Sequence, residues 1–257
     1  MRVTFLGTGT SQGVPVIACT CAVCQSKDSH DKHLRTSALI ETDKGKNILI
    51  DIGPDFREQM LREHVTHLDS ILITHAHRDH VGGLDDIRPF NWVQREKMEI
   101  YCNREARVAI ERDYHYIFGY HEFPGLPEAN LHELSGDEPV LLAAGEEVMP
   151  IKALHKDLPV LGYRLGQLAY ITDANHIDSK EIEKLKGVDT LVINSLRRQK
   201  HFSHFCLPES LEIIRMVQPR VAYLTHVSHE MGLYAETEKE LPEHVHLAYD
   251  GLKITVE

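Results

Sequence analysis

The segment ILITHAHRDHVGG, residues 71–83, contains four side chains of the types that bind metal ions, and all four fall within six consecutive positions. His75 and His77 are two residues apart, and Asp79 and His80 are adjacent. One pair can therefore face one metal ion while the other pair faces a second ion. An apolar run precedes these side chains and two glycines follow them, which predicts a tight loop at the end of a buried strand. Because rigid scaffolds place reactive groups on such loops, the segment indicates a metal centre and not a solvated loop with incidental histidines.

The segment resembles the HxHxDH signature of the metallo-β-lactamase superfamily, and the match is complete. The resemblance implies an α/β fold of the αββα sandwich type, in which two mixed sheets are flanked by helices and the metal ions lie at the edge where the sheets meet. Relatives with a redox di-iron centre carry glutamate at the position that His77 holds here, so the resemblance favours the hydrolytic branch.

Three later residues match further ligand motifs of the superfamily, and each follows a strand-like run: His155, Asp173 and His226. Taken alone, His155 is equally typical of a surface histidine and Asp173 of a turn or helix cap, so these assignments depend on the resemblance. The implied ligands, which share Asp173 as a bridge, are His75, His77 and His155 for one ion and Asp79, His80 and His226 for the other. Imidazole and carboxylate ligands suit zinc, manganese or iron better than magnesium or calcium.

Two such ions can bridge a hydroxide nucleophile and clamp a phosphoryl oxygen, and this hydrolysis needs no organic cofactor. Asp79 is counted with His204 among the catalytic residues. His204 matches the histidine with which the phosphodiesterase and tRNase Z branches assist the leaving oxygen as a general acid, and it precedes an apolar pattern that predicts a helix. His201 is the alternative for that role. Either a substrate contact or a solvated basic patch is expected for Arg197, Arg198 and Lys200.

Three cysteines form a Cys-x-Cys-x-x-Cys motif, and their spacing is too close for the disulfide framework of a secreted protein: Cys19, Cys21 and Cys24. Their thiolates can supply three corners of a tetrahedral zinc site. His229 follows His226 by three residues in THVSH, and it could supply the fourth corner if the two rings point in opposite directions. Such a site would be closed and structural. Three free thiols in a reduced cytosol are the alternative.

The cysteine motif, the start GTGTSQGVP and the segment THVSH together resemble the PhnP-type cyclic phosphodiesterases of phosphonate breakdown, over nearly the whole chain. The resemblance implies one structural zinc ion, manganese or zinc at the active pair, and a small phosphodiester, linear or cyclic, as substrate. It also implies a homodimer. The alternatives are a tRNase Z-like ribonuclease, a PqqB-like protein of cofactor biosynthesis, a thioester hydrolase of the glyoxalase II kind and a noncatalytic zinc-binding scaffold.

Four further residues have supporting roles in this interpretation. Asp51 resembles the family aspartate that supports the ligand loop, where it would hydrogen-bond a metal ligand without touching the ion. Asp250 either does the same or caps a turn before glycine. Cys102 and Cys206 have no partner pattern and are expected to be packing thiols.

The elements that must position these residues follow from apolar patterning. Strands are predicted at 3–6, 37–41, 47–50, 70–73, 99–101, 148–153, 162–165, 168–171, 190–193, 221–224 and 253–256. Helices are predicted at 55–63, 104–114, 179–186 and 208–217, and loops at 119–130 and 135–145. Strands first pair with one another and then alternate with helices, and this order returns in the second half. The pattern predicts two stacked sheets with helices outside, in a single domain of residues 1–257.

Composition narrows the class of protein. Apolar residues make up 42% and charged residues 26% of the 257 positions, as in ordinary globular proteins. The formal charge of −11 opposes binding to nucleic acid, and we find no insertion of the kind with which tRNase Z grips RNA. No apolar stretch has the length of a membrane span, and no export signal is visible, so a cytoplasmic location is expected. The 18 histidines exceed what packing requires.

Overall fold

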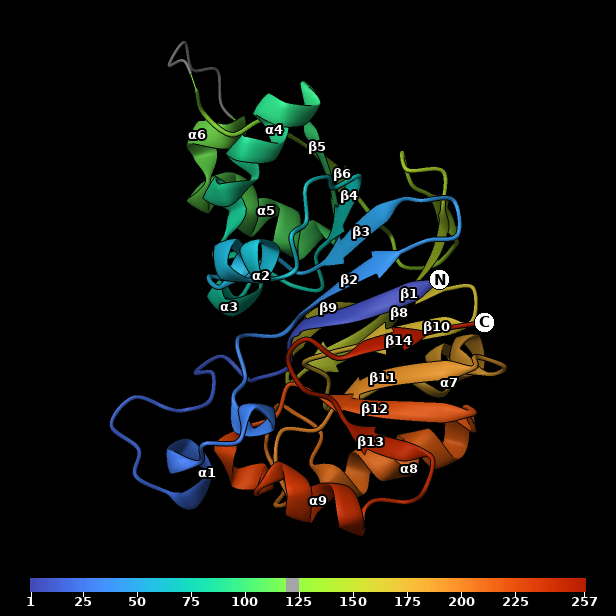
Figure 1. The fold of residues 1–257 in the computed structure, drawn as a ribbon. Coiled ribbons are helices and arrows are strands. Elements are labelled where there is room, and N and C mark those ends of the chain that lie inside the picture. Colours follow the sequence, from blue (N-terminus) through green and yellow to red (C-terminus); the bar gives the residue numbers. More distant parts are fainter. Residues whose placement is uncertain (119–124) are drawn as a thin grey trace.

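The computed structural model describes residues 1–118 and 125–257, over which a pair of seven-stranded sheets packs face to face (Figure 1). The first sheet contains, in spatial order, β14 (Lys253–Thr255), β1 (Arg2–Gly7), β2 (Ser37–Glu41), β3 (Asn47–Ile50), β4 (Ser70–Leu72), β5 (Met98–Cys102) and β6 (Ala129–Glu133). The second contains β13 (Val245–Leu247), β12 (Val221–Thr225), β11 (Thr190–Asn194), β10 (Leu168–Ile171), β9 (Leu158–Leu165), β8 (Glu147–His155) and β7 (Val140–Leu141).

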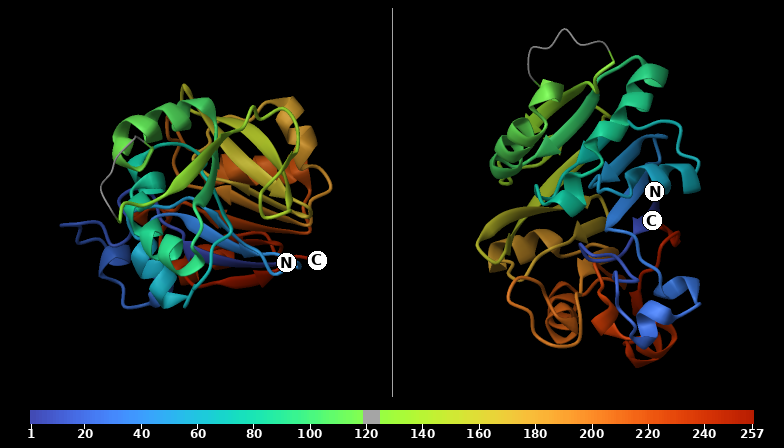
Figure 2. Two further views of the ribbon diagram at one scale, coloured as in Figure 1. Left: turned by 90° about the horizontal axis from the view of Figure 1, so that it is seen from above. Right: turned by 90° about the vertical axis from the view of Figure 1, so that its left-hand side faces the viewer.

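Both sheets are mixed, and both have the same internal order. In the first, β1, β2 and β3 pair antiparallel, and β3 to β6 then pair parallel. In the second, β7 to β10 pair antiparallel, and β10 to β13 then pair parallel. The chain ends lie side by side in both views of Figure 2, because β14 pairs with β1. The predicted return of the strand order in the second half is therefore confirmed at the level of topology.

Helices cover the outer faces of the sandwich, as Figure 1 shows. Those beside the first sheet are α2 (Phe56–Arg62), α3 (Arg78–Val81), α4 (Arg88–Gln94), α5 (Arg104–Asp113) and α6 (His115–Phe118). Those beside the second are α7 (Ser179–Leu185), α8 (Leu207–Val217) and α9 (Tyr234–Glu240), while α1 (Ala22–Gln25) lies in the long loop after β1. Within the described residues, no helix combines the length and the apolar character that crossing a membrane requires.

The strands are continuous apolar runs because both of their faces are buried. In β2, Ala38 and Ile40 belong to the core between the sheets, whereas Leu39 belongs to the core under the helices of the first sheet. A third core lies between the second sheet and its helices, with Ile193 of β11 packed in one cluster with Ile214 of α8. The αββα sandwich that the resemblance implied is therefore present.

Every predicted strand and helix is present, but several elements were missed. The strands β6, β7 and β13 contain only two apolar residues each, and the short helix α9 buries Thr237 alone. The loop predicted at 135–145 contains β7, and the loop predicted at 119–130 ends in β6; residues 119–124 of that loop lie outside the described residues. These elements form because neighbouring strands and helices supply the contacts that their own sequences do not indicate.

Candidate metal centre

Four strand ends at one edge of the sandwich present the candidate ligands. His75 follows β4, His155 is the last residue of β8, Asp173 follows β10 and His226 follows β12 directly. Asp173 and His226 both have a left-handed backbone with φ of 55°, and Asp51 after β3 has φ of 58°. Such conformations cost roughly 1–3 kcal/mol for a residue other than glycine, and they persist where the surrounding structure enforces them. Strained backbone therefore gathers at this edge.

Asp79 and His80 lie in the first turn of a short helix, not in the loop that was predicted. This helix, α3, begins after His77, whose carbonyl accepts a hydrogen bond from the His80 N–H (2.9 Å). Because of this turn, the side chains of Asp79 and His80 point in another direction than those of His75 and His77. The latter two remain on the extended segment before the helix.

Gly83 is required after α3 by close packing and not by an unusual backbone angle, since its φ is −97°. A Cβ at this position would lie 2.4 Å from the carbonyl oxygen of Gly53 and 2.7 Å from Cβ of Phe56. A Cβ on Gly53 would in turn lie 2.2 Å from the Asp79 carbonyl oxygen. The ligand segment and the segment after β3 thus touch backbone to backbone.

The candidate ligands form two adjoining groups. In each group one ligand atom per residue lies within 4.8 Å of all the others. The first group contains His75, His77 and His155, and the second contains Asp79, His80, Asp173 and His226. A further set within the same limit, His155, Asp173 and His204, joins the two groups. The structure therefore brings together all seven residues that the sequence singled out for this centre.

Hydrogen bonds on the outer side of the imidazoles direct their other nitrogens toward the centre. Nδ1 of His155 is 2.7 Å from the carbonyl oxygen of Ser203, so it must carry the proton. Nδ1 of His80 is 2.6 Å from Oδ2 of Asp51. Each of these rings therefore turns its Nε2 toward the centre, the arrangement in which a second group fixes the orientation of a ligating histidine.

Buried polar atoms without partners show that these residues fit a metal pair. Nε2 of His80 and both ring nitrogens of His226 are buried and have no hydrogen-bond partner among the described residues. Nε2 of His80 also lies 3.1 Å from both Asp79 Oδ2 and Asp173 Oδ2. Since unsatisfied buried polar atoms are costly, atoms converging in this way are best explained by a cation between them.

The charged residues of the second group also indicate that a cation fits between them. Burial would lower the pKa of His80, but Asp173, Asp79 and Asp51 raise this pKa well above its usual range. Burial would raise the pKa of Asp173, but His226 and His80 hold it well below the usual range. Three carboxylates around one imidazole therefore favour positive charge at this point, which a divalent cation would supply.

His204 lies in the loop between β11 and α8, three residues before the helix that was predicted to begin near it. Its ring stacks on His226 with centroids 4.9 Å apart and lies 4.5 Å from the ring of His155. Its Nδ1 is buried, unpartnered and 3.6 Å from Oδ1 of Asp173. Burial first, and then His226, lower the pKa of His204 to about 3, so the ring is neutral at pH 7 before an anionic substrate arrives.

The basic residues upstream of His204 are engaged in structural contacts. Arg197 donates to Oε2 of Glu230 (2.7 Å), and Arg198 donates to Oε2 of Glu240 (2.6 Å) and to the Met231 carbonyl (2.8 Å). Lys200 is 84% exposed. The two arginines therefore hold the 229–240 segment in place, and the alternative of a wholly solvated basic patch does not describe them.

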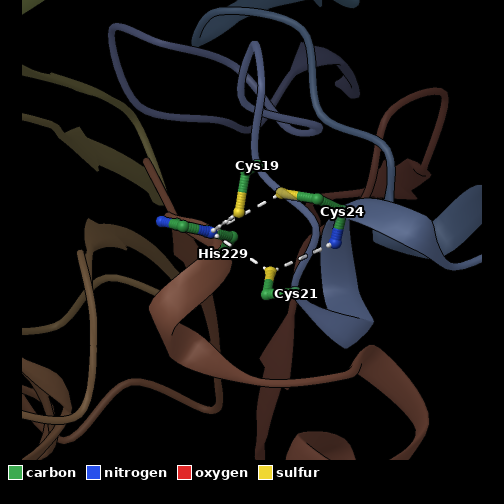
Figure 3. A group of neighbouring side chains, drawn as sticks. All are labelled: Cys19, Cys21, Cys24 and His229. Atoms are coloured by element: carbon green, nitrogen blue, oxygen red, sulfur yellow. Dashed lines mark hydrogen bonds between the residues drawn. The ribbon is translucent and has the colours of Figure 1, made fainter.

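The three clustered thiols meet His229, as Figure 3 shows. The sulfur atoms of Cys19, Cys21 and Cys24 lie 3.3, 3.3 and 3.5 Å from Nδ1 of His229. All four ligand atoms lie within 4.8 Å of one another, as four corners of a single zinc site would. His226 belongs to the group with Asp79, His80 and Asp173, so the two histidines of THVSH lie in different groups of candidate ligands.

At the group of Cys19, Cys21, Cys24 and His229, backbone N–H groups lie against the sulfur atoms and favour the thiolate form. The Cys24 N–H points to the sulfur of Cys21, and this contact, followed by His229, lowers the Cys21 pKa to about 6. Burial raises the pKa of Cys24 to about 11, although the Val16 N–H lies against its sulfur (3.3 Å). A zinc ion would replace the remaining thiol proton, because zinc binds cysteine as the thiolate.

Comparison with known proteins agrees with this geometry. The model of the beta-lactamase superfamily domain matches residues 46–227, which include every candidate ligand of the two adjoining groups. The chain belongs to the metallo-β-lactamase superfamily. The matched region begins after the cysteine motif and ends before His229, so the thiol group lies outside the matched residues.

Within the superfamily, the chain is similar to a solved diphosphatase of the PhnP family, with 38% identity and a TM-score of 0.92 over 100% of this chain and 98% of that one. It therefore stands close to the PhnP family. The zinc-bound PqqB of Methylobacterium extorquens has the same fold, with 17% identity and a TM-score of 0.80 over all of both chains. A protein of Porphyromonas gingivalis named octanoyltransferase is 42% identical over the whole chain, which spans 52% of that protein's length.

Asp51, which is buried, and Asp250, whose side chain is 11% exposed, each accept hydrogen bonds from the N–H and hydroxyl of one threonine. Asp51 accepts both from Thr74, at 2.8 Å each, and its Oδ2 also faces His80. Asp250 accepts from the N–H and hydroxyl of Thr8 at 2.9 and 2.7 Å, and from the N–H of Leu34 at 2.7 Å. Asp51 thus supports the candidate centre, whereas Asp250 ties the end of β1 to the returning loop.

Replacing Asp51 with asparagine is expected to weaken metal binding about 10- to 100-fold, because His80 loses the charged acceptor that orients it. The measurement is the dissociation constant of manganese at the active pair, by competition with a chelator. Asp250→Asn is the matched control and should change this constant much less, since its partners are Thr8 and Leu34 and neither is a candidate ligand. An equal loss in both variants would mean that the effect is general destabilisation.

The remaining thiols are buried away from both groups. Burial raises the pKa of Cys102 to about 12, which fits a packing residue of β5. Cys206 is the N-cap of α8, where its side chain and that of Glu209 form a reciprocal cap. It therefore does more than pack.

Two residues that hold the centre were missed by the sequence analysis. The carbonyl of Ser203 accepts from His155, and Asn175 accepts from the Lys156 N–H (2.7 Å) while donating to the Phe202 carbonyl (3.1 Å). Most of these contacts use backbone groups, which every residue type carries. The sequence offered no signal for them beyond the proximity of Asn175 to Asp173.

Proposed function

We propose that this metallo-β-lactamase superfamily hydrolase is a dinuclear metal-dependent phosphodiesterase that cleaves small phosphodiesters, linear or cyclic. The observation that carries the proposal is the convergence of seven imidazole and carboxylate side chains in two adjoining groups, with His204 buried against both. The PhnP-family diphosphatase, which is similar over its whole length, supports phosphoryl chemistry.

Each group of residues has a distinct role in this proposal. The first group and the second group would each hold one ion, manganese or zinc, with Asp173 between them. Bound there, the two ions would activate a water molecule and stabilise charge on the phosphoryl oxygens. Cys19, Cys21, Cys24 and His229 would hold one structural zinc ion.

His204 would deliver a proton to the leaving alkoxide. Its ring is neutral in the free protein, so the negative charge of a bound phosphodiester has to raise its pKa before it can act. The rings of His226 and His155, with centroids 4.9 and 4.5 Å from that of His204, would keep this ring oriented. We also propose a cytoplasmic location, where the three thiols stay reduced, and a homodimer on the basis of family resemblance.

The full chain reconstituted with manganese is expected to hydrolyse bis-p-nitrophenyl phosphate, with release of p-nitrophenolate as the readout. Activity should disappear on removal of metal and return on its addition. A protein that binds two ions in the two adjoining groups yet releases no p-nitrophenolate would contradict the proposal. A panel of ribose cyclic phosphate, cyclic nucleotides and a tRNA precursor would then rank the substrate classes; the formal charge of −11 disfavours RNA.

A second candidate function is thioester hydrolysis, because the name of the Porphyromonas gingivalis relative, 52% of whose length this chain spans, indicates octanoyl-group chemistry and not phosphoryl chemistry. Octanoyl thioesters test it. A departing thiolate needs no proton, so His204→Ala should slow the cleavage of a phosphodiester whose leaving group is an alkoxide, such as a cyclic nucleotide, and leave thioester cleavage nearly unchanged. Faster turnover of the octanoyl thioester than of bis-p-nitrophenyl phosphate would favour this second function.

A further inference from the structure

A hollow of about 330 Å³ opens beside the first group of candidate ligands. His77 and His155 line one side of it. The two-residue turn between β8 and β9 and the segment Phe202–Ser203 line the others. None of the roles proposed above uses this space, although it adjoins the site.

Phe202 is the unusual residue of this hollow. Its side chain is 71% exposed, whereas the neighbouring Phe205 is 5% exposed and packs in the core. Its ring contacts His201 with centroids 4.4 Å apart, which leaves most of the apolar surface open to solvent. Leu158 adds a second apolar contact surface within the same hollow. An aromatic face beside a reactive site is suited to stack a flat ring.

The walls of the hollow are tied together, so the space is preformed. Asn175 accepts a hydrogen bond from the Lys156 N–H at 2.7 Å and donates to the Phe202 carbonyl at 3.1 Å. These two hydrogen bonds connect the β8–β9 turn to the segment that contains Phe202. His155 adds a second tie through Ser203. Preformed space reduces the entropy lost when a ligand binds.

The charged side chains at the rim nearly cancel. Nζ of Lys156 lies 3.9 Å from Oδ2 of Asp157, and both residues line the hollow. With one positive and one negative charge at the same rim, the hollow favours no net charge on its ligand. An uncharged ring fits better than a second phosphate.

The position of the hollow identifies the portion of the substrate that it would hold. Ser203 lies in its lining and is followed directly by His204, the proposed proton donor to the leaving oxygen. The alcohol that receives this proton must depart on the same side. We propose that the hollow binds the leaving alcohol and prefers a flat aromatic ring stacked on Phe202. The preferred substrates are therefore aryl or nucleoside phosphodiesters, an inference that rests on the proposed function.

Binding of product analogues to the manganese-loaded chain tests this subsite by isothermal titration calorimetry. Phenyl phosphate is compared with methyl phosphate, and adenosine monophosphate with ribose phosphate, so that the aryl and nucleoside sources are measured apart. The ring-bearing compound of at least one pair should bind more tightly. Phe202→Ala should weaken its binding about 5- to 50-fold, the range for loss of one ring stack, and leave the ring-free partner unchanged.

Two further variants complete the experiment. Phe202→Tyr keeps the aromatic face and should keep the preference. Trp92→Ala removes another exposed aromatic side chain (63% exposed), which lies on α4, and should change neither compound's affinity. An unchanged ring preference in Phe202→Ala would overturn the proposal, as would equal binding of both members of both pairs to the wild-type chain.

Turnover separates this inference from the proposed function. If bis-p-nitrophenyl phosphate is hydrolysed but Phe202→Ala leaves the ring preference intact, the subsite is wrong and the phosphodiesterase stands. If no hydrolysis occurs while phenyl phosphate binding still depends on Phe202, the hollow is an aromatic subsite of a different reaction. Calorimetry measures the subsite whether or not the chain turns over a phosphodiester.

Discussion

Turnover of a 2′,3′-cyclic nucleotide, whose leaving group is a basic alkoxide, by the His204→Ala variant is expected to fall about 10²- to 10⁴-fold, the range that a positioned general acid contributes. The metal content should not change, because the seven candidate ligands of the two adjoining groups would hold the ions without this ring. The measurements are kcat under saturating substrate and metal content by elemental analysis. Together they separate a proton donor from a ligand.

The structure makes this distinction necessary, because His204 also lies within 4.8 Å of ligand atoms of His155 and Asp173. Loss of one ion from the variant would show that His204 is a ligand, and the assignment as proton donor would then be wrong. His201→Ala is the comparator. Its ring is 5.3 Å from that of His204 and more exposed, so we expect a smaller effect than for His204→Ala. A larger loss in His201→Ala would transfer the role to that residue.

The features of the site that could be predicted from the sequence are those that depend on residues close together in the chain. His75, His77, Asp79 and His80 follow one buried strand, and a strand end fixes where the next few side chains go. The apolar runs were also recognisable, because strands buried on both faces are apolar throughout. The later ligands, in contrast, were identified through family resemblance, since one histidine or aspartate after a strand is common.

Features that depend on distant residues could not be predicted. The left-handed backbone at Asp173 and His226 is imposed by packing around the strand ends, and no residue type indicates it. The contacts of Arg197 and Arg198 were equally hidden, because their carboxylate partners lie 33 and 42 residues further along the chain. The short helix α3 forms in a segment whose histidines suggested a loop.

Replacing Cys21 with serine is expected to remove about one zinc ion per chain and to lower stability. Three of the four ligand atoms would remain, but a serine hydroxyl is a poor substitute for a thiolate. A ligand present at a thousandfold excess over its dissociation constant stabilises the native state by about 4 kcal/mol. For a chain of this size, loss of that contribution lowers the melting temperature by roughly 10 °C. The measurements are zinc content and thermal unfolding.

The same variant should also weaken the active pair, to a smaller extent. The Val227 N–H donates to the Thr8 carbonyl (2.9 Å), and the Thr10 N–H donates to the Val227 carbonyl (3.0 Å). The loop that carries the thiols is thereby joined to the residue beside His226.

Cys206→Ser is the matched control for the zinc measurement, because this cysteine caps α8. The zinc content of this variant should equal that of the wild type. Undiminished zinc in Cys21→Ser would contradict a Cys3His site, because the three remaining thiol and imidazole ligands cannot close the tetrahedron alone.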